Sequence, residues 1–166
     1  MKRRQLLTAG VGIGSAIVAG TAPAQVRASA SLLGANPIVG SWFGTAVLID
    51  PPLGSFGDLI SFHADHTVIE SRRYSVHDTP LGSLLETTGH GVWRQQGLNT
   101  YEVLFRFILQ SAETAAIVGS DTVRLSLVLD TLAGTLAGAF ETEVRDTAEN
   151  LLLVAHGNYT ANQIAF

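Results

Sequence analysis

The stretch TYEVLFRFILQ, residues 100–110, alternates apolar and polar side chains along most of its length. Successive side chains of a β-strand point to opposite faces, so a period of two predicts a strand with one buried face and one face in water. Glu102, Arg106 and Gln110 belong to the water-facing side. The side chains expected on the buried face are Tyr101, Val103, Phe105, Phe107 and Leu109.

Similar runs lie on both sides of this stretch and are separated by turn signals such as the Pro51-Pro52 pair, which cannot donate to a strand ladder. A longer loop is expected at residues 77–87, which contain Pro80 and Gly82. The expected strands span residues 39–49, 58–63, 67–74, 89–95, 100–110, 118–130, 135–145 and 151–164.

Eight consecutive strands joined mostly by short turns predict an all-β fold, an eight-stranded antiparallel up-and-down β-barrel, because closure removes both exposed sheet edges. An open sandwich or a jelly roll is the alternative, and either needs longer crossovers than most of these turns offer. A barrel of eight strands has room for packed side chains or one small ligand. The connections at 50–57, 75–88 and 111–115 are expected to lie around one mouth, where a ligand would enter.

Composition narrows the possible functions. The chain has 166 residues, of which 46% are hydrophobic and 14% are charged, so one domain with a sizeable core is expected. The absence of cysteine excludes disulfides and thiolate metal sites. There are 10 Lys and Arg against 14 Asp and Glu, and no Lys follows Lys2. An acidic domain of this kind lacks the positive surface that nucleic acid requires.

The N-terminal residues predict an export signal. Lys2, Arg3 and Arg4 precede an uncharged stretch at 5–20 that is too short to span a membrane, and Ala22-Pro23-Ala24 suits cleavage by signal peptidase. We therefore expect a signal at 1–24, a flexible linker at 25–36 and a β-barrel domain at 37–166. The Arg pair resembles a twin-arginine signal, with ordinary secretion as the alternative. Either pathway predicts an extracytoplasmic protein without a stable membrane anchor.

The first strand opens with Gly40-Ser41-Trp42, and in an eight-stranded meander this Gly-x-Trp resembles the calycin superfamily. Residues 61–68 and 89–93 are similar to a group of bacterial lipocalin-like secreted proteins. Allene-oxide-cyclase-like barrels share the same plan. The resemblance implies a barrel that binds a hydrophobic small molecule in its lumen, or a cyclase that uses the same cavity.

The residues proposed to contact a ligand are the inward aromatic and aliphatic side chains, together with a histidine on the last strand if its register turns it inward. They are Trp42, Tyr101, Phe105, Phe107, Leu109 and His156. The leading hypothesis is an exported barrel that binds a hydrophobic small molecule. The alternatives are a cyclase- or isomerase-type enzyme, and a structural barrel with a filled core that forms a homodimer.

No catalytic motif, cofactor fingerprint or metal-ligand pattern is found, so no cofactor or metal is expected. His63 and His66 flank a tight turn, around which their side chains would diverge. The pairs Glu70/Arg72 and Glu102/Arg106 are each expected to form ladders on the outer surface. A Glu inside the barrel would instead have a raised pKa and could act as a general base.

The export hypothesis makes a direct prediction. Replacing Arg3 and Arg4 together by Lys should retain the protein in the cytoplasm, because the twin-arginine pathway reads both guanidinium groups. Cell fractionation followed by immunoblotting measures this. Unchanged secretion of the double variant would assign the protein to the general pathway.

Overall fold

The structure is a computed structural model that describes residues 36–72, 75–79 and 82–165. The predicted signal at 1–24 and all but the last residue of the predicted linker at 25–36 lie outside the described residues. Within the described ranges the regular structure consists of β-strands only. None of these residues forms a helix with the length and hydrophobicity needed to cross a membrane.

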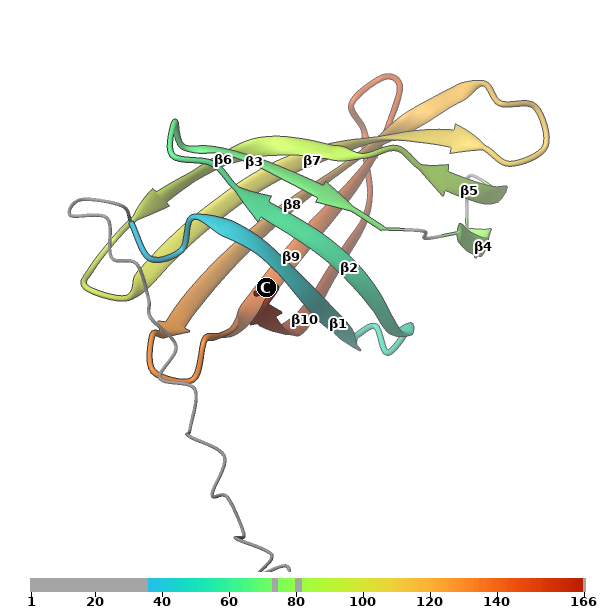
Figure 1. Cartoon of the computed structure of the whole chain (residues 1–166). Coiled ribbons are helices and arrows are strands. Elements are labelled where there is room, and N and C mark those ends of the chain that lie inside the picture. Colours follow the sequence, from blue (N-terminus) through green and yellow to red (C-terminus); the bar gives the residue numbers. More distant parts are fainter. Residues whose placement is uncertain (1–35, 73–74, 80–81, 166) are drawn as a thin grey trace, which may run out of the picture. The chain divides into compact units, whose positions relative to one another are not determined.

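The strands close into a barrel (Figure 1). β1, β2, β3, β6, β7, β8, β9 and β10 pair in that order, every pair is antiparallel, and β10 closes the ring on β1. The eight-stranded up-and-down barrel is therefore confirmed, and the sandwich and jelly roll are excluded. The strands are β1 (Gly40–Asp50), β2 (Gly54–Phe62), β3 (Thr67–Ser71), β4 (Ser75–Thr79), β5 (Gly82–Glu86), β6 (Gly89–Gln95), β7 (Thr100–Ser111), β8 (Ile117–Asp130), β9 (Thr135–Asp146) and β10 (Leu151–Gln163).

The loop predicted at residues 77–87 is wrong, because β4 and β5 form a hairpin there. β7 pairs with β6 over residues 101–106 and with β5 over residues 109–111. β6 and β5 therefore lie one after the other along the same edge of β7. Two features explain the strand. Leu84 is buried, and the backbone of β5 finds partners along β7. Gly82, with φ of 84°, is the first residue of β5 and lies next to the connection between the two strands of the hairpin. This glycine therefore belongs to a short hairpin connection and not to a long loop.

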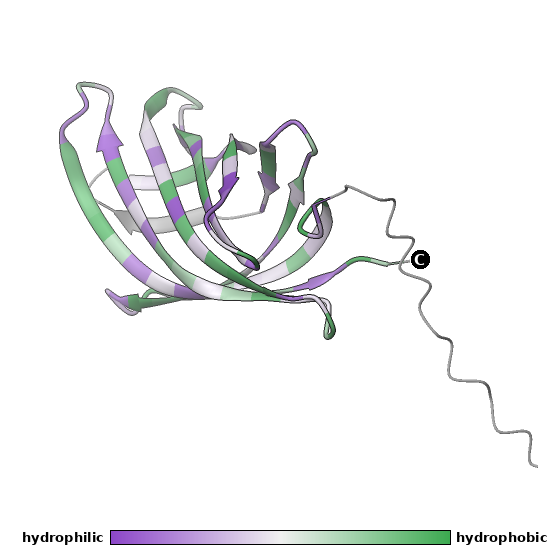
Figure 2. Cartoon of the chain, turned by 90° about the vertical axis from the view of Figure 1, so that its left-hand side faces the viewer, coloured by the Kyte–Doolittle hydropathy of each residue, from purple (hydrophilic) through white to green (hydrophobic). Residues whose placement is uncertain are grey.

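Hydropathy alternates from residue to residue along most strands (Figure 2). The apolar residues of this alternation make up the buried core. All five inward residues predicted on β7 are buried. At the base, defined as the end where β1 begins, the indole of Trp42 donates to the Ile38 carbonyl at 2.9 Å. There the ring of Trp93 lies edge-on to Phe62 and Tyr101, with centroids 6.2 and 6.0 Å apart. Aromatic packing therefore fills the base.

The opposite end of the barrel is called the mouth. It carries the β1–β2, β7–β8 and β9–β10 turns and the β4–β5 hairpin. The three connections predicted at one mouth do lie at this same end, with the central one folded as a hairpin.

Phe105 and Leu104 provide a matched test of the inner and outer faces of β7, since they are 3% and 41% exposed. Phe105→Ala should lower the free energy of unfolding by about 3–5 kcal/mol through lost burial and a residual cavity. Leu104→Ala should cost about 1 kcal/mol or less. Urea unfolding measures both. Similar losses in the two variants would contradict the assigned faces.

Candidate functional site

Five charged side chains meet inside the upper half of the barrel, toward the mouth. Four carry carboxyl groups and come from four different strands, β2, β3, β5 and β8, and the fifth is an arginine just after β3. All five are buried or nearly so. We call this group the lumenal carboxyl cluster, and its members are Asp58, Glu70, Arg72, Glu86 and Asp121.

Strand geometry places the cluster inside. Asp58 lies two residues before the buried Ile60 of β2, so both are on the same face of that strand. Glu70 lies two residues after the buried Val68 of β3 and shares its face in the same way. The register sets Ile60 opposite Glu70, so both strands present these residues to the lumen. The predicted outer ladder of Glu70 and Arg72 is therefore wrong. Burying Val68 also turns the residues two and four positions later inward.

Arg72 binds two of the four carboxyl groups. Its Nε donates to Glu86 Oε2 at 2.7 Å, and its Nη2 donates to Asp121 Oδ2 at 3.4 Å. The guanidinium also lies over the rings of Phe107 and Phe56, 4.2 and 4.6 Å from their centroids. Glu86 and Asp121 therefore have a cation at hydrogen-bond distance, and aromatic rings flank that cation. Asp121 also accepts a hydrogen bond from the Thr142 hydroxyl.

Glu70 is in a different position. Its side chain is 0% exposed, and neither carboxyl oxygen accepts a hydrogen bond from an N–H or hydroxyl donor among the described residues. The carboxyl group of Asp58 is near enough to share a proton with it. The closest contact to a cation runs from Oε1 to Arg72 Nε at 3.8 Å. The neighbouring Asp58 accepts a hydrogen bond from the Tyr159 hydroxyl at 3.0 Å. Glu70 is thus the carboxyl group of the cluster that no N–H or hydroxyl donor of the described residues reaches.

These surroundings change the protonation of the cluster. Burial raises the pKa of Glu70 to about 9, with the negative charges of Asp58 and Glu86 adding to the effect and Arg72 opposing it. Burial and the charge of Glu86 raise the pKa of Asp121 to about 7, again against Arg72. The pKa of Asp58 is also raised by burial. At neutral pH Glu70 therefore carries a proton, and Asp121 is close to its midpoint.

Gly44 makes room for the contact between Asp58 and Tyr159. A Cβ at this position would lie 2.1 Å from the Tyr159 hydroxyl and 2.2 Å from Asp58 Oδ1. Gly89 does the same for Phe107, whose ring would be 2.6 Å from an added Cβ. Glycine at these two positions lets bulky and polar groups occupy the lumen without pushing the strands apart.

Of the residues predicted to contact a ligand, Phe107 lies directly against the cluster. Phe105 packs edge-on to Phe107 at 5.3 Å between centroids, and Leu109 is the next inward residue on β7. Trp42 and Tyr101 belong to the packed base. Sequence reasoning missed Asp58, Glu86 and Asp121, although each lies two residues from an apolar residue of the same face.

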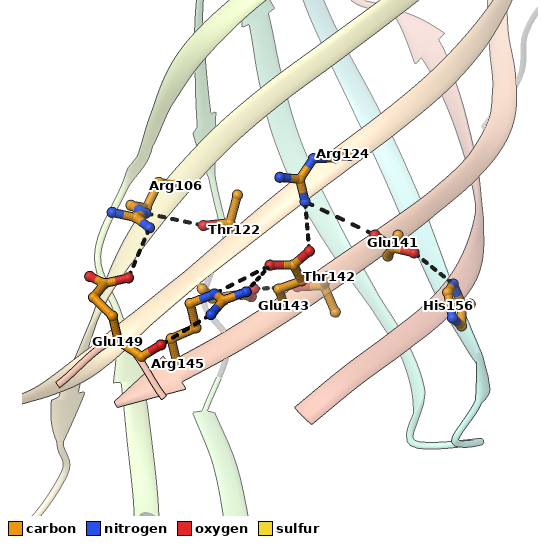
Figure 3. Close-up of polar contacts among 10 residues, drawn as sticks. Arg106, Thr122, Arg124, Glu141, Thr142, Glu143, Arg145, Glu149 and His156 are labelled. Carbon is orange, nitrogen blue, oxygen red and sulfur yellow. Dashed lines mark hydrogen bonds and ion pairs between the residues drawn. The ribbon is translucent and has the colours of Figure 1, made fainter. Parts of the chain in front are cut away.

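His156 lies on the outer wall. Its side chain is 53% exposed, and its Nδ1 is 3.7 Å from Glu141 Oε2 (Figure 3). The predicted lumenal position of His156 is therefore wrong, because Ala155 and Gly157 are the inward residues of β10. A sequence signal was available in Tyr159, which is buried and has the same parity as these two residues.

The outer wall carries a ladder of ion pairs across β8 and β9 (Figure 3). Arg124 contacts Glu143 at 3.0 Å, and Arg145 contacts the same carboxylate at 2.9 Å. Glu102 and Arg106 also face outward, as predicted, and contact Arg94 and Glu149 respectively. Exposed pairs of this kind contribute little to stability, about 0–1 kcal/mol each. They keep this wall hydrophilic.

Other candidate sites are weaker. A groove of about 490 Å³ runs over β6, β7 and β8 between the outward side chains Val92, Leu104 and Arg124. Within the described ranges no group of three or more His, Cys, Asp or Glu residues is placed to hold a metal ion. The ring of His66 instead lies against Trp93, with centroids 4.7 Å apart.

Comparison with known proteins finds no matching family model, no matching curated protein and no matching solved structure. The closed barrel is compatible with a calycin-like fold.

The raised pKa values give stability a distinctive pH dependence. Glu70 and Asp121 bind protons more tightly in the folded chain than in the unfolded chain, so each contributes a loss of stability as pH rises from its unfolded pKa toward its folded pKa. Between about pH 5 and pH 8 the free energy of unfolding should fall, by up to roughly 1.4 kcal/mol per pH unit for each group. Glu70→Gln should flatten this slope and be more stable than wild type at the alkaline end.

Urea unfolding at a series of pH values measures the slope. The matched control is Glu102→Gln, which removes a carboxylate from the outer wall and should keep the wild-type slope. Equal slopes in wild type and Glu70→Gln would contradict the assigned protonation of Glu70.

Proposed function

We propose that this protein binds a hydrophobic small molecule in the lumen of its barrel, with a polar group of the molecule held by the lumenal carboxyl cluster. The observation that carries the proposal is Glu70, which is fully buried and accepts no hydrogen bond from an N–H or hydroxyl donor of the described residues. Leaving a buried polar group unsatisfied costs about 1–3 kcal/mol. A barrel with only a structural role would be more stable with an apolar residue there.

The surroundings of Glu70 fit a small-molecule site, which is typically apolar with a few well-placed polar groups. The inward side chains Phe105, Phe107 and Leu109 supply apolar surface on β7. Asp58 and Glu70 supply oxygen acceptors on β2 and β3. A ligand that enters at the mouth would meet both kinds of surface, whereas the base offers packed aromatic rings only.

A second candidate is a cyclase- or isomerase-type enzyme, and one observation favours it. The cluster combines a carboxyl group whose pKa is raised to about 9, in Glu70, with one whose pKa is raised to about 7, in Asp121. Two acids held at different protonation levels in a buried site suit general acid–base catalysis near neutral pH. In this case Glu70 would donate a proton and Asp121 would accept one.

The proposed setting of the activity is outside the cytoplasm. The basic N-terminus, the uncharged stretch after it and the Ala-x-Ala sequence at 22–24 support an exported chain. We also propose membership of the calycin superfamily, supported by the closed barrel and by the Gly-x-Trp at the start of β1. Both proposals agree with a protein that captures a small apolar molecule after export.

The proposal can be tested with two glycine variants of adjacent strands. Gly44→Ala places a methyl group against Tyr159 and Asp58, so it should weaken binding of the apolar fluorescent probe N-phenyl-1-naphthylamine by about tenfold or more. Gly57→Ala places its methyl group on the outer side, where the nearest atom is 3.7 Å away, and should bind like wild type.

Native mass spectrometry of the wild-type chain should show a bound small molecule that is lost when the chain unfolds.

Stability must be measured beside binding, because Gly44→Ala also crowds the lumen. Tyr159→Phe removes the hydroxyl without adding volume, and it should weaken binding with a smaller effect on urea unfolding. Probe affinity equal to wild type in both Gly44→Ala and Tyr159→Phe would show that the ligand does not reach the cluster.

A further inference from the structure

We propose that the polar group of the ligand is a cation, an alkylammonium or similar organic amine, bound between the carboxyl groups of Asp58 and Glu70. This inference rests on the proposed function and adds the chemical class of the ligand. It is carried by three observations: the charge of the cluster, the hydrogen bonds that its members already make, and the aromatic rings around it.

Counted over the described residues, the cluster has more negative than positive groups. Its five members bring four carboxyl groups and one guanidinium, and they come together where the side chains are almost entirely out of water. Buried carboxylates need a positive partner or a proton, because transfer of a bare charge out of water is very unfavourable. A protein that binds an anion or a neutral apolar molecule here would gain nothing from so many acids.

The existing contacts show which carboxyl groups have no cation at hydrogen-bond distance among the described residues. Arg72 is engaged with Glu86 and Asp121, at 2.7 and 3.4 Å. Glu70 lies farther from it, at 3.8 Å, and accepts no hydrogen bond from an N–H or hydroxyl donor. Asp58 accepts a hydrogen bond from Tyr159, a neutral donor. Asp58 and Glu70 therefore suit a ligand group that is positively charged and donates hydrogen bonds. An ammonium meets both conditions and has three N–H groups.

The aromatic rings agree with this chemistry. Phe56 and Phe107 face the guanidinium of Arg72 at 4.6 and 4.2 Å, so this part of the lumen already stabilises one organic cation through ring faces. Phe105, next to Phe107, extends the apolar surface along β7. An amine with an apolar body would place its charge at the carboxyl groups and its body on these rings.

In the absence of ligand, a proton bound to Glu70 takes the place of the missing positive charge. The groups that act on Glu70 are Asp58 of β2, Arg72 after β3 and Glu86 of β5, and Asp121 of β8 lies beyond Arg72. Burial and the negative charges of Asp58 and Glu86 outweigh the effect of Arg72 and keep the Glu70 carboxyl neutral, with a pKa of about 9. Binding of an ammonium would replace that proton by a fixed positive charge, so uptake of amine should release a proton into solution.

The test compares three ligands that share one apolar body: hexylamine, 1-hexanol and hexanoate. Isothermal titration calorimetry of the full chain near neutral pH should give about tenfold or more tighter binding of hexylamine than of 1-hexanol, because hydrogen bonds between charged groups are stronger than those of a neutral hydroxyl. Hexanoate should bind most weakly. Titration in buffers of different ionisation enthalpy should also report proton release with hexylamine.

Two variants locate the effect. Glu70→Gln should reduce the preference for hexylamine over 1-hexanol to about threefold or less. Glu102→Gln removes a carboxylate from the outer wall and should leave the preference intact.

The outcomes separate this inference from the proposed function. Binding of 1-hexanol or hexanoate as tightly as hexylamine would overturn the assignment of a cation and leave lumenal binding in place. A preference for hexylamine that persists in Glu70→Gln would overturn the assigned position. Failure of all three compounds to bind would overturn the proposed function, and this inference with it.

Discussion

Closure of β10 on β1 is the constraint on which the rest of the molecule depends. Once the sheet is a ring, each strand has one face that sees only the lumen, and the two-residue period of the strand decides which side chains lie on that face. A single apolar residue that must be buried fixes the position of its neighbours two residues away. Val68 thereby turns Glu70 inward, and Ile60 does the same for Asp58. The lumenal carboxyl cluster is a consequence of this geometry.

The same rule explains what could be read from the sequence and what could not. β7 alternates cleanly, so its inner face was predicted residue by residue. In β3, Val68 and Ile69 are adjacent and both apolar, so either parity was compatible with burial. The run 151–155 at the start of β10 is apolar throughout, which left the direction of His156 open. Only the pairing of each strand with its neighbours decides such cases.

The β4–β5 hairpin was missed for a related reason. Each of its strands has only five residues, and turn-forming residues flank them, so local propensity favours a loop. What makes β5 a strand is distant in sequence: it pairs with β7 at Leu84, Leu85 and Glu86, beyond the point where β6 leaves that edge. Tertiary pairing therefore outweighs the local signal.

The two ends of the barrel contribute differently to stability. The base buries the rings of Trp42, Phe62, Trp93 and Tyr101. Their polar atoms form hydrogen bonds; the Tyr101 hydroxyl, for example, donates to Asn36 at 2.9 Å. The upper half buries charges, and a buried ion network is rarely more stable than apolar packing of the same volume. Removing one partner from such a network is costly, however, because the remaining charges lose their counter-ion. Arg72 is in this position, since it joins Glu86 on β5 to Asp121 on β8.

Arg72 connects the β4–β5 hairpin at the mouth with the carboxyl groups in the lumen. β5 pairs with β7 at three positions, and two backbone hydrogen bonds flank them, from Ala112 to Ser83 and from Thr87 to Ile108. The contact of 2.7 Å between Arg72 and Glu86 adds a buried, charged connection from the end of β3 to β5. The same guanidinium therefore contacts Glu86 on the hairpin and lies 3.8 Å from Glu70 in the lumen. The residues that give the lumen its acidic character are also those that fasten the hairpin at its mouth, and this explains why Arg72 is present where four carboxyl groups would otherwise repel one another.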